Sequence, residues 1–169
     1  MPSGTRSYVT VYDYTPDDFE KLEVSCDIAS EDFFEHVVPH RNEWGDVHHI
    51  ELEDLEYESR NNQLTFTAET KWHGPAEWLQ AASGTEFFTH KLMTMAIITR
   101  DETTVDAVAV LDRDVLHERN LVQLDSETVG VLYETDEVDE LDSLLWQPIE
   151  EFNKECRELY LAQEGESND

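Results

Sequence analysis

Four histidines in the first third of the chain have the spacing that could most directly support metal chemistry. His36 and His40 are four residues apart, which puts two side chains on one face of a helix, and His48 and His49 follow shortly after. Imidazole nitrogens in such clusters bind zinc and related metals. Pro39 should end a helix between the first pair, so we favour scattered surface histidines and keep a metal-dependent enzyme as an alternative.

Motifs of other common catalytic sites are absent. The sequence contains no HExxH or CxxC metal motif, no GxSxG nucleophile elbow, and only six glycines, without a phosphate-binding loop among them. Cys26 and Cys156 are too few for a disulfide framework, and we expect both to be reduced. We therefore predict a protein that is not an enzyme and that uses no cofactor.

Acidity is the strongest feature of the composition. The chain of 169 residues has 40 Asp and Glu against 11 Lys and Arg, a net charge of -29. Nucleic-acid backbones and anionic membranes attract Lys and Arg, so we expect no direct binding to either. No apolar run approaches the roughly 20 residues of a spanning helix, and the first residues lack a signal peptide's apolar stretch. These features predict a cytoplasmic protein.

The acids are concentrated toward the C-terminus. Residues 112–169 hold 18 acids and 4 bases, whereas residues 1–111 hold 22 and 7, so the C-terminal third has nearly twice the charge density. Six acids fall within 134–142, and a charged helix follows. The predicted acidic face for partner binding consists of Glu134, Asp136, Glu137, Asp139, Glu140, Asp142, Glu150, Glu151, Glu155 and Glu158.

Three interpretations of this acidity are open. An acidic surface keeps a protein soluble in molar salt, which would mark a halophilic protein with a housekeeping role. A mimic of nucleic acid would present the same charge to a basic groove, and 29 charges correspond to roughly 50 Å of duplex. The third interpretation is an ordinary solvated surface. The C-terminal concentration favours mimicry, since salt adaptation predicts an even spread.

Hydrophobic patterning predicts one α+β domain over residues 1–162 and a polar, disordered tail over 163–169. We expect an antiparallel sheet with helices on one face, plus a C-terminal amphipathic helix. Expected strands span 7–14, 63–72, 92–99 and 105–111, with an irregular or bulged edge strand near 50–57 and a second hairpin from 121–124 and 128–134. Short helices are expected over 16–22, 30–38 and 75–82.

The C-terminal helix is the clearest single element. Its apolar stripe consists of Leu145, Ile149, Phe152, Cys156 and Leu159, at spacings of four, three, four and three. Proline is tolerated only near a helix start, so Pro148 predicts a start at Asp142 or later.

Two groups of aromatic residues also bear on function. We expect Trp72, Trp78, Phe87 and Phe88 to pack in the core, and Trp44 and Trp146 are candidate interface anchors.

Several segments, taken in order over residues 1–112, resemble the YubB-like ferredoxin-like family of phage, prophage and conjugative-plasmid proteins. The resemblance lies in Met1-Pro2 before the strand Tyr8–Val11, Phe33-Phe34 before Val38-Pro39, Glu43-Trp44-Gly45, and the strand Leu64–Trp72 followed by Gly74-Pro75 and a helix. Gly4-Thr5-Arg6 and the C-terminal helix depart from the family. The resemblance implies a ferredoxin-like core and a mobile-element origin, without a known activity.

Together these observations predict a non-catalytic, acidic accessory protein of a phage or other mobile element. Its expected partner is a basic protein in the host cytoplasm, bound most directly through mimicry of nucleic acid that inhibits a restriction or CRISPR effector. A halophilic housekeeping protein and a metal-dependent enzyme, such as a hydrolase, are the alternatives, and homodimerisation is left open.

Overall fold

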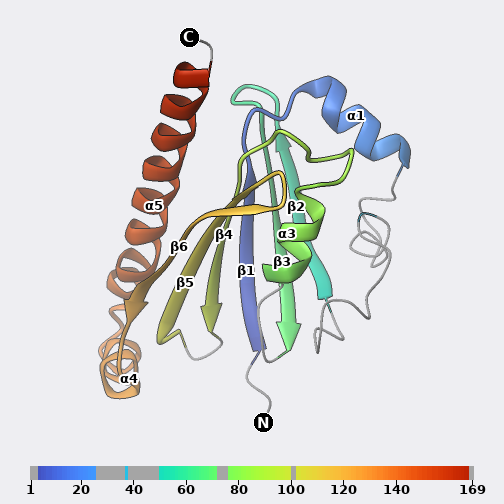
Figure 1. The fold of residues 1–169 in the computed structure, drawn as a ribbon. Coiled ribbons are helices and arrows are strands. Elements are labelled where there is room, and N and C mark those ends of the chain that lie inside the picture. The colour runs from blue at the N-terminus through green and yellow to red at the C-terminus, as the bar shows by residue number, and fades with distance from the viewer. Residues whose placement is uncertain (1–3, 26–36, 38–49, 72–75, 100–101, 168–169) are drawn as a thin grey trace.

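The computed structural model describes residues 4–25, 37, 50–71, 76–99 and 102–167 (Figure 1). Within these residues, six strands form one antiparallel sheet in the order β2-β3-β1-β4-β5-β6. The strands are β1 (Gly4–Val11), β2 (Ile50–Glu58), β3 (Gln63–Lys71), β4 (Met93–Thr99), β5 (Thr104–Leu111) and β6 (Asp114–Gln123). The helices are α1 (Pro16–Ser25), α3 (Ala76–Ala82), α4 (Ser126–Glu134) and α5 (Val138–Ser167). The predicted antiparallel α+β class is confirmed.

Each face of the sheet carries its own helical layer. Side chains alternate along β1, so Val9 and Val11 point to the same face. There they pack in one cluster with residues of α1 and α3, including Trp78, and with Phe88. Tyr8 packs on the opposite face, in a cluster that α4 and α5 complete, and a second cluster on that face joins Tyr12 to α5. We expected helices on one face of the sheet. The helices α1 and α3 share one face, whereas α4 and α5 cover the other, because the apolar stripe of α5 packs on β4, β5 and β6.

Most of the predicted strands are confirmed within a few residues. The irregular strand near 50–57 is β2, an edge strand whose pairing with β3 shifts between Leu52 and Asp54. Such a bulge inserts one extra residue, which explains why the apolar positions change parity there. In the described residues, the elements from β1 to β4 follow the order β1–α1–β2–β3–α3–β4. The predicted helix over 30–38 lies outside the described residues except for residue 37.

The predicted second hairpin is wrong. Residues 114–123 form β6 beside β5, and residues 126–134 form the helix α4. Asp125 caps that helix, because its Oδ1 accepts a hydrogen bond from the Thr128 amide at 2.7 Å. Val129 and Leu132, three residues apart, then face the core together. The β-branched residues of the segment 126–134 are typical of strands, which explains the wrong prediction. The side chains of β6 are mostly exposed, so its sequence shows little apolar alternation.

The C-terminal helix is longer than predicted at both ends. It begins at Val138, contains Pro148 in its interior and runs to Ser167, into the expected tail. Pro148 has no amide hydrogen, so the Leu144 carbonyl lacks its helical hydrogen-bond donor. Because Leu144 is exposed, water can donate to that carbonyl instead. Tyr160 is 7% exposed, whereas Leu159 is 47% exposed, so Tyr160 and not Leu159 closes the buried stripe.

An ion pair connects α5 to Asp13, which lies two residues after the end of β1. The guanidinium of Arg157 donates to both carboxylate oxygens of Asp13 at 2.5 and 2.7 Å. The same group lies 5.1 Å from the ring centre of Tyr12. The hydrogen bonds from Arg157 hold the pKa of Asp13 below its ordinary value.

We expect Arg157→Gln to lower the free energy of unfolding by about 1 kcal/mol at pH 7, since the pair is bidentate but partly solvated. A carboxyl whose pKa is lowered in the folded state stabilises the protein at pH values above its unfolded pKa, near 3.9. This contribution is lost as the pH falls through the pKa of the folded state. The difference between wild type and variant should therefore shrink in urea titrations below about pH 4. Lys154→Gln removes the same charge and should have a smaller effect, and an equal effect would contradict the assignment.

Candidate partner-binding surface

All ten acids predicted to bind a partner are exposed. The buried stripe of α5, which includes Leu141, Leu145 and Ile149, turns toward the sheet and leaves its acids on the sides and outer face. Figure 1 shows α5 running beside the sheet over most of the length of the molecule. The acids of α5 from Asp139 to Glu158 thus face solvent.

The structure divides these acids into two groups. The junction acids lie at the end of α4, in the connection, and in the first turns of α5: Glu134, Asp136, Glu137, Asp139, Glu140 and Asp142. The helix acids lie farther along α5: Glu150, Glu151, Glu155 and Glu158. Between Asp142 and Glu150 the helix rises about 12 Å without an acid. The acidic surface is thus interrupted by a neutral band around Leu144 and Pro148.

The two groups differ in how far nearby bases compensate them. Glu155 accepts a hydrogen bond from Arg119 on β6 at 2.8 Å, and His117 lies 3.9 Å from the same carboxylate. Among the described residues, no ion pair involves a junction acid. The junction acids are therefore the stronger source of negative potential toward a basic partner.

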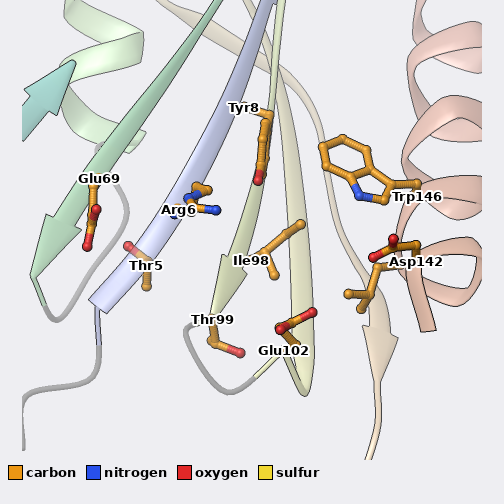
Figure 2. Close-up of a pocket in the computed structure, with 10 residues that line it drawn as sticks. Thr5, Arg6, Tyr8, Glu69, Ile98, Thr99, Glu102, Asp142 and Trp146 are labelled. Carbon is orange, nitrogen blue, oxygen red and sulfur yellow. The ribbon is translucent and has the colours of Figure 1, made fainter. Parts of the chain in front are cut away.

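A groove of about 420 Å³ lies beside the junction acids (Figure 2), and sequence reasoning did not predict it. It separates β1 and its neighbours in the sheet from the first half of α5. Among the described residues, the helix packs mainly against β4, β5 and β6 on that face and reaches β1 through the contact of Trp146 with Tyr8. The residues that line it include Arg6, Tyr8, Glu69, Glu102, Asp142 and Trp146.

Aromatic rings form one wall of this groove. The half-buried Trp146 meets Tyr8 edge to face, with ring centres 4.5 Å apart and planes at 74°. Figure 2 shows Tyr8 on β1 and Trp146 and Asp142 on α5, with Ile98 between the two sides. The sequence offered one signal for this site, because Trp146 is an aromatic residue in polar surroundings.

Acids lie on both sides of the groove. Glu102 accepts a hydrogen bond from the hydroxyl of Tyr133 on α4, and its own amide donates to the Thr99 carbonyl at 2.9 Å. The hydrogen bond to Glu102 raises the pKa of Tyr133, and the negative charge of Asp142 adds to this effect. Across the groove, Arg6 and Glu69 are direct partners on neighbouring strands, so their charges offset each other.

The candidate metal region cannot be compared with the sequence prediction, because His36, His40, His48 and His49 lie outside the described residues. Within the part of the chain that is described, no three His, Cys, Asp or Glu side chains are arranged to hold a metal.

Burial raises the pKa of Cys156 to about 11, so this thiol is a poor nucleophile at neutral pH. Of the helices described, none is both long and apolar enough to cross a bilayer.

The arrangement is suited to electrostatic binding. Exposed carboxylates with few compensating bases attract a basic surface over a distance comparable to the Debye length, and the groove adds an aromatic contact surface. The core aromatics are distributed as predicted where they are described, with Trp78 and Phe88 fully buried and Phe87 partly buried.

The chain was also compared with known proteins. Comparison with family models, curated proteins and solved structures finds no match for this chain.

Proposed function

We propose that this chain acts without catalysis, by binding a basic surface of a nucleic-acid-binding protein in place of nucleic acid. The observation that carries the proposal is the line of exposed acids from the α4–α5 junction along α5. Six of these acids lie at the junction, where the described residues supply no base to pair with them. A surface of this kind favours rapid association with a basic groove.

The spacing of the charges supports mimicry. Seven of the predicted acids lie on α5 between Asp139 and Glu158. Nineteen residue steps in a helix rise about 29 Å, so these carboxylates average one per about 4 Å. One strand of duplex DNA carries one phosphate per about 3.4 Å. The neutral band after Asp142 makes the match uneven, so we expect the two groups to engage separate basic patches.

The sharper form of the proposal places the chain in a phage or other mobile element. It would then act in the host cytoplasm on a defence nuclease, such as a restriction enzyme or a CRISPR effector. This form rests on the resemblance of residues 1–112 to mobile-element proteins and on the order of the first four strands and their helices. The basic DNA-binding cleft of such a nuclease is the partner surface that the acids fit best.

Inhibition of DNA cleavage tests this proposal. The purified chain is titrated into a panel of restriction endonucleases and RNA-guided nucleases at about 0.1 M salt, where exposed charges still interact over about 10 Å. We expect inhibition of at least one nuclease that weakens when the DNA concentration or the salt concentration is raised. Absence of inhibition across the panel, or inhibition that excess DNA does not relieve, would contradict competition for the DNA site.

A halophilic protein is the second candidate, and one observation favours it. Exposed acids also lie far from α5, on α1 at Asp17, Glu20 and Glu23 and on β2 at Asp54 and Glu56. This wider spread is what solvation in molar salt would require.

A melting series from about 0.05 to 3 M salt separates the two candidates, because the Debye length falls over this range from beyond 10 Å to below about 3 Å. For a mimic, we expect the chain to be folded at the lowest salt, with a melting temperature that changes only modestly. A chain that folds only near molar salt would support halophilic solvation and remove the main support for mimicry. Circular dichroism at each salt concentration provides the measurement.

A further inference from the structure

The groove beside α5 combines two features that together select a cationic ligand. One wall is aromatic, and Glu102 and Asp142 are among the residues that line the groove. A cation placed over an indole is attracted by the negative face of the ring, and a nearby carboxylate adds a charge-assisted hydrogen bond. The groove is therefore more than a cluster of acids, because its shape and its aromatic wall fix where a cation can lie.

Charge in the groove is unbalanced toward the helix side. Three carboxylates and one guanidinium line it. Arg6 and Glu69 face each other across β1 and β3, so the charge of Arg6 is offset on the sheet side. Glu102 and Asp142 then leave a net negative site beside Trp146. Tyr133 and the Thr99 carbonyl hold Glu102 in this position before any ligand binds.

We propose that this groove receives one arginine side chain of a basic partner protein, with its guanidinium between Trp146 and the carboxylates of Glu102 and Asp142. A guanidinium is flat, stacks on aromatic rings and offers a fork of donors that matches carboxylates, whereas an ammonium is a point charge. The inference rests on the proposed function for the basic character of the partner. It adds a specific anchor to a surface that would otherwise act through charge alone.

A blocked tripeptide with one arginine, acetyl-Gly-Arg-Gly-amide, is the probe. Binding is followed by the indole N–H resonance of Trp146, identified as the signal that disappears in Trp146→Phe. We expect a saturable shift of that resonance with the arginine peptide, a severalfold weaker response with lysine, and none with citrulline, which keeps the shape but loses the charge. Equal responses to citrulline, or equal affinity for lysine, would overturn the assignment.

Charge-matched variants locate the site. The double variant Glu102→Gln and Asp142→Asn should weaken binding by about tenfold or more, because it removes both charge-assisted contacts, while the side-chain amide introduced at position 102 can still accept from Tyr133. The control Glu20→Gln and Glu23→Gln changes the net charge equally on α1, on the other face of the sheet, and should stay within about twofold. Arg6→Gln should tighten binding severalfold, since it removes the positive charge that offsets Glu69 and so makes the groove more negative. Equal weakening by both doubles would overturn the inference.

The outcomes separate this inference from the proposed function. If the arginine peptide binds the groove but no nuclease is inhibited, the groove assignment stands and the mimic proposal fails. If nucleases are inhibited but the peptide leaves the Trp146 resonance unchanged, the mimic proposal stands and the groove assignment fails. Spectra and melting temperatures of each variant show whether it is folded, and a double variant that unfolds is replaced by the single variants Glu102→Gln and Asp142→Asn, each of which should weaken the arginine response.

Discussion

Neutralising four junction acids is expected to weaken inhibition of a sensitive nuclease by about 30- to 700-fold. The variant combines Asp136→Asn, Glu137→Gln, Asp139→Asn and Glu140→Gln. Exposed ion pairs contribute about 0.5–1 kcal/mol each, and every 1.4 kcal/mol is a factor of ten in affinity. The inhibition constant at about 0.1 M salt is the measurement, and its dependence on salt should also become shallower.

A second variant with the same net charge serves as the control. It combines Asp17→Asn, Glu20→Gln, Glu23→Gln and Glu77→Gln, all exposed positions of α1 and α3 on the other face of the sheet. If α4 and α5 form the binding surface, this variant should retain inhibition within a few-fold of wild type. Equal losses in the two variants would show that overall charge, and not the junction, attracts the partner.

Truncation of Phe152 should produce the largest loss of stability on α5. Its side chain is 1% exposed and lies where the helix crosses β6, with the His117 ring stacked 5.9 Å away and the Arg119 guanidinium 5.6 Å from its ring centre. Removing a buried phenylalanine side chain leaves a cavity, and the expected cost is about 3–5 kcal/mol. At about 2–4 °C per kcal/mol, the melting temperature should fall by roughly 10 °C.

Leu159→Ala provides the comparison on the same helix. Leu159 is 47% exposed, so its truncation should change the free energy of unfolding by less than about 0.5 kcal/mol. The sequence periodicity places both residues on the buried stripe, whereas the structure buries only Phe152. Chemical denaturation of the two variants therefore tests the rotation of α5 on the sheet, and comparable losses would contradict it.

Local patterning was sufficient where a strand has one buried side. In β3, the buried Leu64, Phe66 and Ala68 alternate with half-buried Thr65 and Thr67, and this period of two is visible in the sequence. Helix starts were visible for the same local reason, since Thr15 precedes α1, Pro16 is its first residue, and the Thr15 hydroxyl accepts from the Asp18 amide at 3.2 Å. Such features depend only on residues within one turn or a few strand positions.

The errors came from elements whose environment is set by distant parts of the chain. β6 pairs with β5 on one side only and exposes most of its side chains, so no apolar alternation marks it. Pro148 argued against an early helix start, but Val138 and the residues after it are helical because Leu141 and Leu145 gain burial against β4 and β5. Tertiary packing outweighs local propensity in both places.

The acidic character, the α+β class and the amphipathic final helix follow from composition and periodicity, because each depends on residue type or short-range spacing. The gap between Asp142 and Glu150 is also visible in the sequence, whereas the pairing of Glu155 with β6 is not, since it depends on how α5 is rotated and where it lies on the sheet. The groove has the same origin. Tyr8 and Trp146 are distant in sequence, and they meet because α5 lies along β4, β5 and β6 with Trp146 in contact with Tyr8 on β1.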